Sequence, residues 1–126
     1  MVDSRLDQFI RRIKAQRACL NMAAGLISGM SGPILELGLG NGRTYDHLRE
    51  LFPVRDIYVF ERGVAAHPDC IPDETHLLHG DFKETVPGAL ARIGAPAALI
   101  HGDIGSADSA RDAELAAWVG QDCLLF

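Results

Sequence analysis

The chain has 126 residues, of which 48% are hydrophobic, and its formal net charge is −5. This length holds one domain with a substantial core, and this composition excludes an intrinsically disordered chain. The acidic balance argues against nonspecific binding of nucleic acid, which depends on neutralising phosphates with lysine and arginine.

The spacing of the cysteines and the sequence of the amino terminus indicate the cellular compartment of the protein. The three cysteines, Cys19, Cys70 and Cys123, are far apart and form no Cys-x-x-Cys pair, which favours reduced thiols over a disulfide framework or a zinc site. Charged residues interrupt the segment where a signal peptide would be apolar, and no apolar run reaches membrane-spanning length. We therefore expect a cytoplasmic protein that does not span a membrane.

The first predicted element is an amphipathic helix from about Ser4 to Ile27. Ser4 and Asp7 resemble a capping box, apolar residues then recur at helical spacing, and the glycines and proline within 29–33 end the helix. The first twenty residues carry five basic against two acidic side chains, whereas residues 56–126 carry four basic against twelve acidic ones. The ordinary interpretation of these basic residues is a solvated helix face.

The stretch Pro-Ile-Leu-Glu-Leu-Gly-Leu-Gly-Asn-Gly, residues 33–42, combines a strand with a glycine-rich turn. Ile34, Leu35 and Leu37 predict a short buried strand, and the glycines after it permit a sharp turn and a close approach of a ligand to the backbone. A helix is predicted from Arg43 to Phe52. Strand, glycine turn and helix in this order form a nucleotide site in parallel α/β sheets.

Two residues of this stretch restrict the kind of nucleotide. Arg43 stands where a dinucleotide fingerprint has its third glycine, which disfavours a pyrophosphate cofactor such as NAD. Glu36 lies two residues before the first glycine in an otherwise apolar strand, where a carboxylate is costly unless a partner binds it. A ligand or a backbone amine could be that partner.

The pattern apolar-apolar-acid-apolar-Gly-x-Gly-x-Gly resembles the first motif of class I S-adenosylmethionine-dependent methyltransferases. This resemblance implies an α/β, Rossmann-like fold with a parallel central sheet flanked by helices, and S-adenosyl-L-methionine as the cofactor. It implies that the glycine loop lies under the methionine part and the ribose, and that the acid helps to hold the amino end. The cofactor-binding residues that it assigns here are Glu36, Gly38, Leu39, Gly40, Asn41, Gly42, Arg43 and Thr44. Such enzymes often cover their site with an amino-terminal helix, which is the alternative interpretation of Gln16 and Arg17.

The second and third predicted strands each end near an acid. Residues 56–61 predict a strand with Glu61 at its carboxyl end, about 20 residues after the glycines, where an acid accepts hydrogen bonds from ribose hydroxyls. The resemblance assigns both Glu61 and Arg62 to the cofactor site, and the alternative is a surface glutamate beside Arg62. After a loop with one helical turn at 65–75, residues 76–79 predict a short strand.

The resemblance assigns the residues after this third strand to the adenine end of the cofactor. Gly80 and Asp81 resemble the family's adenine-binding position, and Phe82 follows them. Asp81 could also cap the next helix, predicted over 82–93, and the two roles are compatible.

The fourth predicted strand, 97–102, runs into Asp103. Residues beyond strand ends line the ligand crevice of an open parallel sheet, so His101, Asp103 and Ser106 are well placed for chemistry.

Methyl transfer needs an oriented nucleophile and, for a protonated nucleophile, a base. Asp103 is the first candidate for a base or substrate clamp and is also assigned to the cofactor site. His101 is the second, because its ordinary pKa suits a base although strand alternation could bury it. The other histidines show no shared metal-ligand spacing, so we interpret them as ordinary surface or strand residues and expect no metal site.

The chain ends with a helix predicted over 109–119 and an apolar segment, 121–126, that predicts the start of a fifth strand. The sheet therefore has four or five strands, whereas the family usually has seven. We expect a single domain over 1–126, with a helical cap over 1–32 and a truncated core over 33–126. An apolar strand on an open sheet edge favours a homo-oligomer.

Three functions follow in order of preference. The first is an S-adenosylmethionine-dependent methyltransferase that acts on a small-molecule substrate. Methylation of DNA adenine or of glutamine is disfavoured, because no Asn-Pro-Pro-Tyr or Asp-Pro-Pro-Tyr follows the fourth strand. The second is a noncatalytic S-adenosylmethionine-binding or interaction module. The third is an NAD-dependent oxidoreductase, which Arg43 and Glu36 disfavour.

Overall fold

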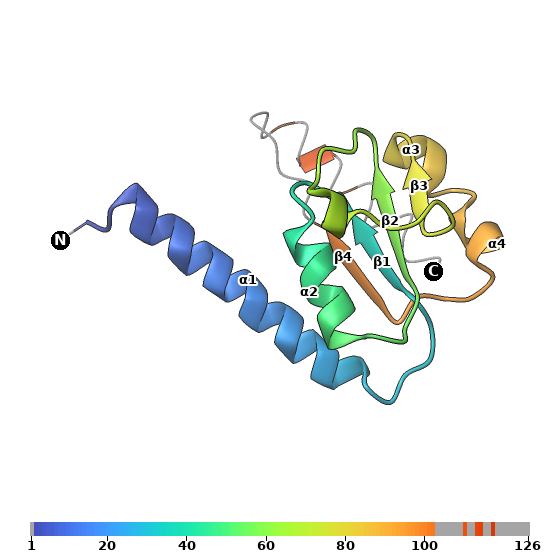
Figure 1. The fold of residues 1–126 in the computed structure, drawn as a ribbon, viewed down its shortest axis with the longest axis horizontal. Helices are drawn as coiled ribbons and strands as arrows, with labels where there is room; N and C mark the ends of the chain where they lie inside the picture. The colour runs from blue at the N-terminus through green and yellow to red at the C-terminus, as the bar shows by residue number, and fades with distance from the viewer. Residues whose placement is uncertain (1, 103–109, 111–112, 115–116, 118–126) are drawn as a thin grey trace.

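The protein forms a parallel sheet with helices on both faces (Figure 1). The computed structural model describes residues 2–102, 110, 113–114 and 117. Its strands are β1 (Ile34–Leu37), β2 (Ile57–Glu61), β3 (Leu77–His79) and β4 (Leu99–Gly102). The predicted α/β, Rossmann-like fold is confirmed. The helix predicted over 109–119 is described only in part, and the strand predicted over 121–126 lies outside the described residues.

The strand order is β3-β2-β1-β4, so β1 lies inside the sheet. The chain moves outward from β1 through β2 to β3 and then returns to place β4 on the other side of β1. Ligands of open α/β sheets bind beyond the carboxyl ends of the strands at such a reversal. Leu37 pairs with Gly102 there, so the glycine loop after β1 begins beside the end of β4.

The amino-terminal helix, α1 (Arg5–Ile27), begins with the predicted capping box. The Ser4 side chain accepts a hydrogen bond from the backbone N–H of Asp7 at 3.0 Å, and the Asp7 carboxylate accepts one from the backbone N–H of Ser4 at 3.3 Å. The carboxyl-terminal half of the helix buries Leu20 and Ile27, whereas the amino-terminal half extends past the sheet (Figure 1). The helix therefore reaches beyond the ends of the strands.

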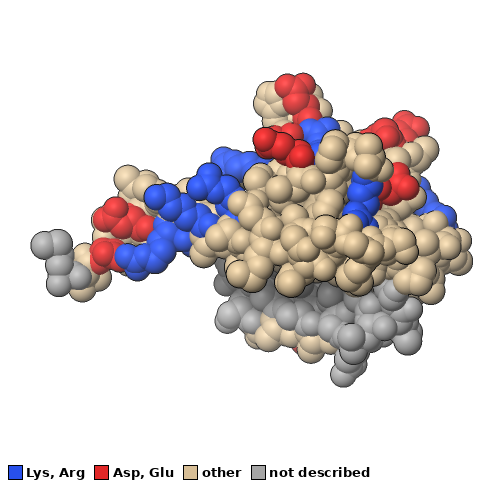
Figure 2. All heavy atoms as spheres, turned by 90° about the horizontal axis from the view of Figure 1, so that it is seen from below, with Lys and Arg blue, Asp and Glu red and all other residues tan. Residues whose placement is uncertain are grey.

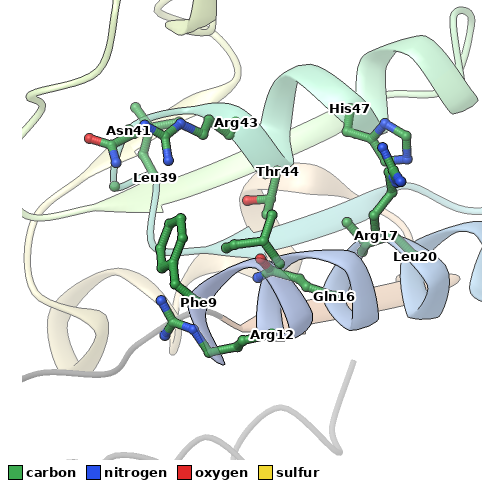
Figure 3. Close-up of a pocket in the computed structure, with 12 residues that line it drawn as sticks. Phe9, Arg12, Gln16, Arg17, Leu20, Leu39, Asn41, Arg43, Thr44 and His47 are labelled. Carbon is green, nitrogen blue, oxygen red and sulfur yellow. The ribbon is translucent and has the colours of Figure 1, made fainter. Parts of the chain in front are cut away.

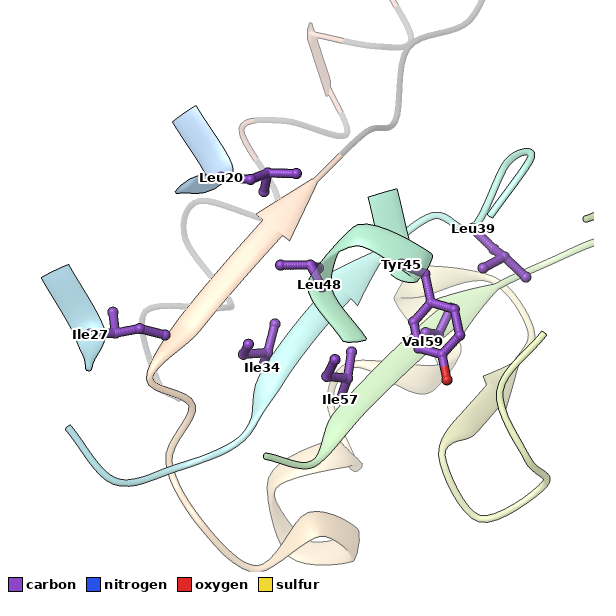
Figure 4. Packing of buried hydrophobic residues seen from close by; sticks show 8 residues of the cluster. All are labelled: Leu20, Ile27, Ile34, Leu39, Tyr45, Leu48, Ile57 and Val59. Atoms are coloured by element: carbon purple, nitrogen blue, oxygen red, sulfur yellow. The ribbon is translucent and has the colours of Figure 1, made fainter. Parts of the chain in front are cut away.

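Two apolar clusters hold the helices on the sheet. Side chains on one face pack under α1 and α2 (Arg43–Leu51), as Figure 4 shows. This first cluster contains Leu20, Ile27, Ile34, Leu39, Tyr45, Leu48, Ile57 and Val59. The opposite face packs against the segment of α3 (Phe82–Thr85) and α4 (Ala89–Ile93). This second cluster contains Leu35, Leu37, Phe60, Leu78, Val86 and Ala89.

The single helix predicted over 82–93 is wrong. The chain forms α3 and α4 instead, and α3 ends before Pro87. Proline lacks an N–H and its ring collides with the preceding turn of a helix, so a continuous helix is disfavoured at this point. The break lets Val86 and Ala89 both enter the second cluster. The helical turn predicted within 65–75 is confirmed as a short 3₁₀ helix, η1 (Pro68–Cys70).

Among the described residues, no helix is both long and apolar enough to cross a bilayer.

Candidate functional site

The glycine loop joins β1 to α2 through residues with left-handed backbone. The φ angles of Gly38, Gly40 and Gly42 are 94°, 52° and 82°, which only glycine adopts without strain. A Cβ on Gly42 would lie 2.5 Å from the Cβ of Cys70, whereas one on Gly40 would meet nothing within 4 Å. Gly42 is therefore required by packing within the protein, and Gly40 leaves space open for a ligand.

Glu61, at the end of β2, holds this loop. Its Oε2 accepts hydrogen bonds from the backbone N–H groups of Leu39 at 2.6 Å and Gly40 at 3.4 Å. Its Oε1 accepts from the N–H groups of Arg62 at 2.9 Å and Gly63 at 3.1 Å. Burial raises the pKa of Glu61, but the four backbone N–H donors outweigh burial and hold the pKa below its ordinary value. The tip of β2 thus places an anionic acceptor beside the glycine loop.

Glu36 is fully buried in β1 and has a partner that the sequence did not reveal. His101 of β4 lies opposite it in the sheet, and His101 Nδ1 is 2.5 Å from Glu36 Oε1. The predicted partner of this acid was a ligand or a backbone amine, and the structure shows an imidazole. Asp103 and Ser106, the other residues predicted near the end of β4, lie outside the described residues.

The residues after β3 lie beside Glu61. The backbone N–H of Gly80 donates to the backbone oxygen of Glu61 at 3.0 Å. Asp81 caps α3 by accepting from the N–H of Lys83 at 3.0 Å, so its predicted capping role is present. Phe82 packs against the second cluster. The adenine-binding role of this segment stays a prediction.

A cavity of about 330 Å³ lies between α1 and the start of α2 (Figure 3). Figure 3 shows side chains of α1 facing the glycine loop and the first turns of α2 across it. Its lining residues are Phe9, Arg12, Ile13, Gln16, Arg17, Leu20, Leu39, Gly40, Asn41, Arg43, Thr44 and His47. The projecting half of α1 therefore forms one wall of a pocket whose opposite wall begins at the carboxyl end of β1.

The cavity brings together only part of the predicted site. The predicted cofactor residues that line it are Leu39, Gly40, Asn41, Arg43 and Thr44. Gln16 and Arg17 also line it, as the alternative interpretation of α1 requires. The lining does not include Glu36, Gly38, Gly42, Glu61, Arg62 or the residues after β3.

Several residues of the cavity wall had no predicted role in the site. Phe9, Ile13 and Leu20 recur on one helical face, which we interpreted only as a packing stripe. His47 was interpreted as an ordinary surface residue, yet it lines the cavity, and its Nε2 lies 2.8 Å from Asn21 Oδ1 of α1. Its spacing of three residues from Thr44 on α2 was the available signal, because such residues share a helix face. In the described part of the chain, no three His, Cys, Asp or Glu residues are grouped to hold a metal ion.

Comparisons with known proteins agree with this geometry. A family model described as S-adenosyl-L-methionine methyltransferase matches residues 3–123. The chain is also similar to a crystal structure described as an S-adenosyl-L-methionine methyl transferase from Silicibacter pomeroyi DSS-3. The two sequences are 50% identical, the TM-score is 0.87, and the match covers 96% of this chain and 74% of the other. No curated protein matches the chain.

Proposed function

This chain belongs to the S-adenosyl-L-methionine methyltransferase family, and from that premise we propose that it methylates a small-molecule acceptor bound between α1 and α2. The observation that carries this proposal is the cavity of about 330 Å³ beside the glycine loop. Its size falls in the lower part of the range of pockets for small ligands, roughly 300–1,000 Å³. Its apolar and polar lining side chains suit an organic molecule with a few polar groups.

The residues around the loop fit the cofactor. The open space at Gly40 lets a ligand approach the backbone, and Glu61 holds the loop from the tip of β2, the position at which an acid binds ribose hydroxyls in such folds. When bound, S-adenosyl-L-methionine supplies a methyl group activated by a positively charged sulfur. The contribution of the chain is then to orient the acceptor and to exclude water from the reacting atoms.

His101 is our candidate for the base among the described residues, and it lies outside the set that lines the cavity. It lies at the carboxyl end of β4, beside the glycine loop, and its side chain is 17% exposed. The contact with Glu36 orients the imidazole, as a carboxylate does for the histidine of a catalytic triad. Asp103, the other candidate, follows it directly in the sequence but lies outside the described residues.

Isothermal titration with S-adenosyl-L-methionine, S-adenosylhomocysteine and NAD tests the cofactor assignment. We expect binding of the first two with a micromolar Kd and no binding of NAD. Consumption of S-adenosyl-L-methionine in the presence of small-molecule extracts then tests catalysis. Binding of the cofactor without turnover of any acceptor would favour the noncatalytic module instead.

A further inference from the structure

We propose that the methyl acceptor is a small organic anion, and that Arg12, Arg17 and Arg43 bind its carboxylate or phosphate group. This inference rests on the proposed function and names its substrate class. The three arginines come from α1 and from the first position of α2, and all of them line the cavity (Figure 3). They therefore border the same partly open pocket, although two different helices carry them.

Among the described residues, no acidic side chain compensates the positive charge around this space. None of the described residues that line the cavity is acidic. In the described part of the chain, Arg11 pairs with Asp3 and Arg49 with Asp46, but none of the three cavity arginines forms an ion pair. Lysine and arginine side chains gather along α1 in Figure 2, although the whole chain has a net charge of −5. Like charges around one cavity repel each other, so a bound anion would stabilise this arrangement.

The cofactor alone does not supply enough negative charge. At neutral pH, S-adenosyl-L-methionine carries a sulfonium, an ammonium and only one carboxylate, so it is a net cation. Its carboxylate can occupy one guanidinium through a bidentate contact. The remaining arginines would then face a cationic ligand. A second ligand with its own negative charge resolves this conflict, and in a methyltransferase that ligand is the acceptor.

The shape and lining of the cavity indicate what kind of anion fits. Guanidinium groups bind carboxylates and phosphates in planar, bidentate geometry. The Arg12 guanidinium lies 5.5 Å from the centre of the Phe9 ring, and Phe9 and Ile13 add apolar surface to the same wall. An anionic group joined to an apolar carbon skeleton matches these neighbours. A pocket of about 330 Å³ favours such a molecule over a nucleic acid backbone, which binds along extended basic grooves.

Phenyl phosphate combines a ring with a phosphate and is the probe that we would use. It would be titrated into the wild-type chain with and without S-adenosylhomocysteine, beside phenol as its uncharged counterpart. We expect binding of phenyl phosphate, no measurable binding of phenol, and a loss of about tenfold or more in affinity for each of Arg12→Ala and Arg17→Ala. Lys14→Ala is the matched control, because Lys14 lies on the same helix with the same charge but does not line the cavity. It should change the affinity by less than about twofold.

Several results would overturn this inference, and they are separable from failure of the proposed function. Wild-type protein that binds S-adenosylhomocysteine but not phenyl phosphate contradicts the anion site alone, as does an equal loss in Lys14→Ala. If the arginine variants weaken S-adenosyl-L-methionine but not its decarboxylated analogue, and leave phenyl phosphate unaffected, the arginines bind the cofactor carboxylate instead. Tighter binding of a DNA duplex than of phenyl phosphate would also exclude a small acceptor. If S-adenosylhomocysteine does not bind, the proposed function fails, while the titration without it still decides on the arginine site.

Discussion

His101 Nδ1 lies 2.5 Å from Glu36 Oε1, and the two residues stand opposite each other on β4 and β1. The Glu36 side chain is 0% exposed, so the imidazole meets a carboxylate that water does not reach. The pair joins the two strands at the point where the strand order reverses and the glycine loop begins. It accounts for an acid in the interior of an otherwise apolar strand.

Replacing His101 should destabilise the fold through this contact. We expect His101→Ala to lower the free energy of unfolding by about 1–3 kcal/mol, because a buried carboxylate loses a hydrogen-bond partner. His101→Asn, which keeps a donor, should lose less. Urea unfolding measures both. His79→Ala is the control, since the exposed side chain of His79 contacts the backbone oxygen of Arg62 at 2.8 Å and its loss should cost less than about 1 kcal/mol. A free energy for His101→Ala within about 0.5 kcal/mol of wild type would contradict this role.

Neutralising Glu61 should release the glycine loop. A glutamine has only one oxygen to accept hydrogen bonds, whereas the Glu61 carboxylate accepts from four backbone N–H groups. We expect Glu61→Gln to lower stability by about 1–3 kcal/mol and to weaken binding of S-adenosylhomocysteine by about tenfold or more. Urea unfolding and isothermal titration provide the two readouts. Exposed Glu74→Gln should leave both unchanged, and unaltered cofactor affinity in folded Glu61→Gln would refute this assignment.

The two glycines of the loop should respond differently to alanine. Both have positive φ, so alanine at either position adds backbone strain of about 1–2 kcal/mol. At Gly42 the new Cβ also collides with Cys70, which adds about 1–3 kcal/mol, whereas at Gly40 it meets no protein atom within 4 Å. We therefore expect Gly42→Ala to be the less stable variant in urea. Gly40→Ala should fold but lose S-adenosylhomocysteine affinity, because Gly40 lines the cavity. The reverse order of stabilities would show that the loop packs differently.

The contacts of His76 predict how stability depends on pH. Its Nδ1 lies 2.8 Å from Asp73 Oδ1 and its Nε2 lies 3.0 Å from Asp56 Oδ1. The hydrogen bond with Asp73 raises the pKa of His76 above its ordinary value of 6.5. A raised pKa means that this stabilisation is complete below about pH 6.5 and is lost as the pH rises through the folded value.

Asp73 sets the lower limit of the same pH window. Its hydrogen bonds, that from Thr75 being the largest cause, lower its pKa from 3.8 to about 2. Its contribution is therefore present above about pH 4 and is lost as the pH falls toward 2.

We expect the difference in unfolding free energy between wild type and His76→Gln to be larger at about pH 5.5 than at about pH 8.5. The exposed, uncharged substitution Met22→Ala should show no such change. Equal differences at both values for His76→Gln would mean that the contact does not form in solution.

The sequence by itself determined the elements whose causes are local. The capping box of Ser4 and Asp7, the apolar run of β1, and the glycines with positive φ act within a few residues, so their effects can be read in order along the chain. The motif they form also indicated the cofactor and the family. The helix predicted incorrectly over 82–93 contained a local signal for its break, Pro87.

Tertiary structure alone decided the contacts between distant residues. His101 meets Glu36 across 65 positions of sequence because β4 lies beside β1 in a particular register, and neither strand's own pattern encodes that pairing. The cavity likewise exists because α1 projects past the sheet and faces the start of α2, which brings Arg12 and Arg17 to the same space as Arg43. Helical periodicity tells which residues share a face, but the partner of that face follows from packing, where many weak contacts act together.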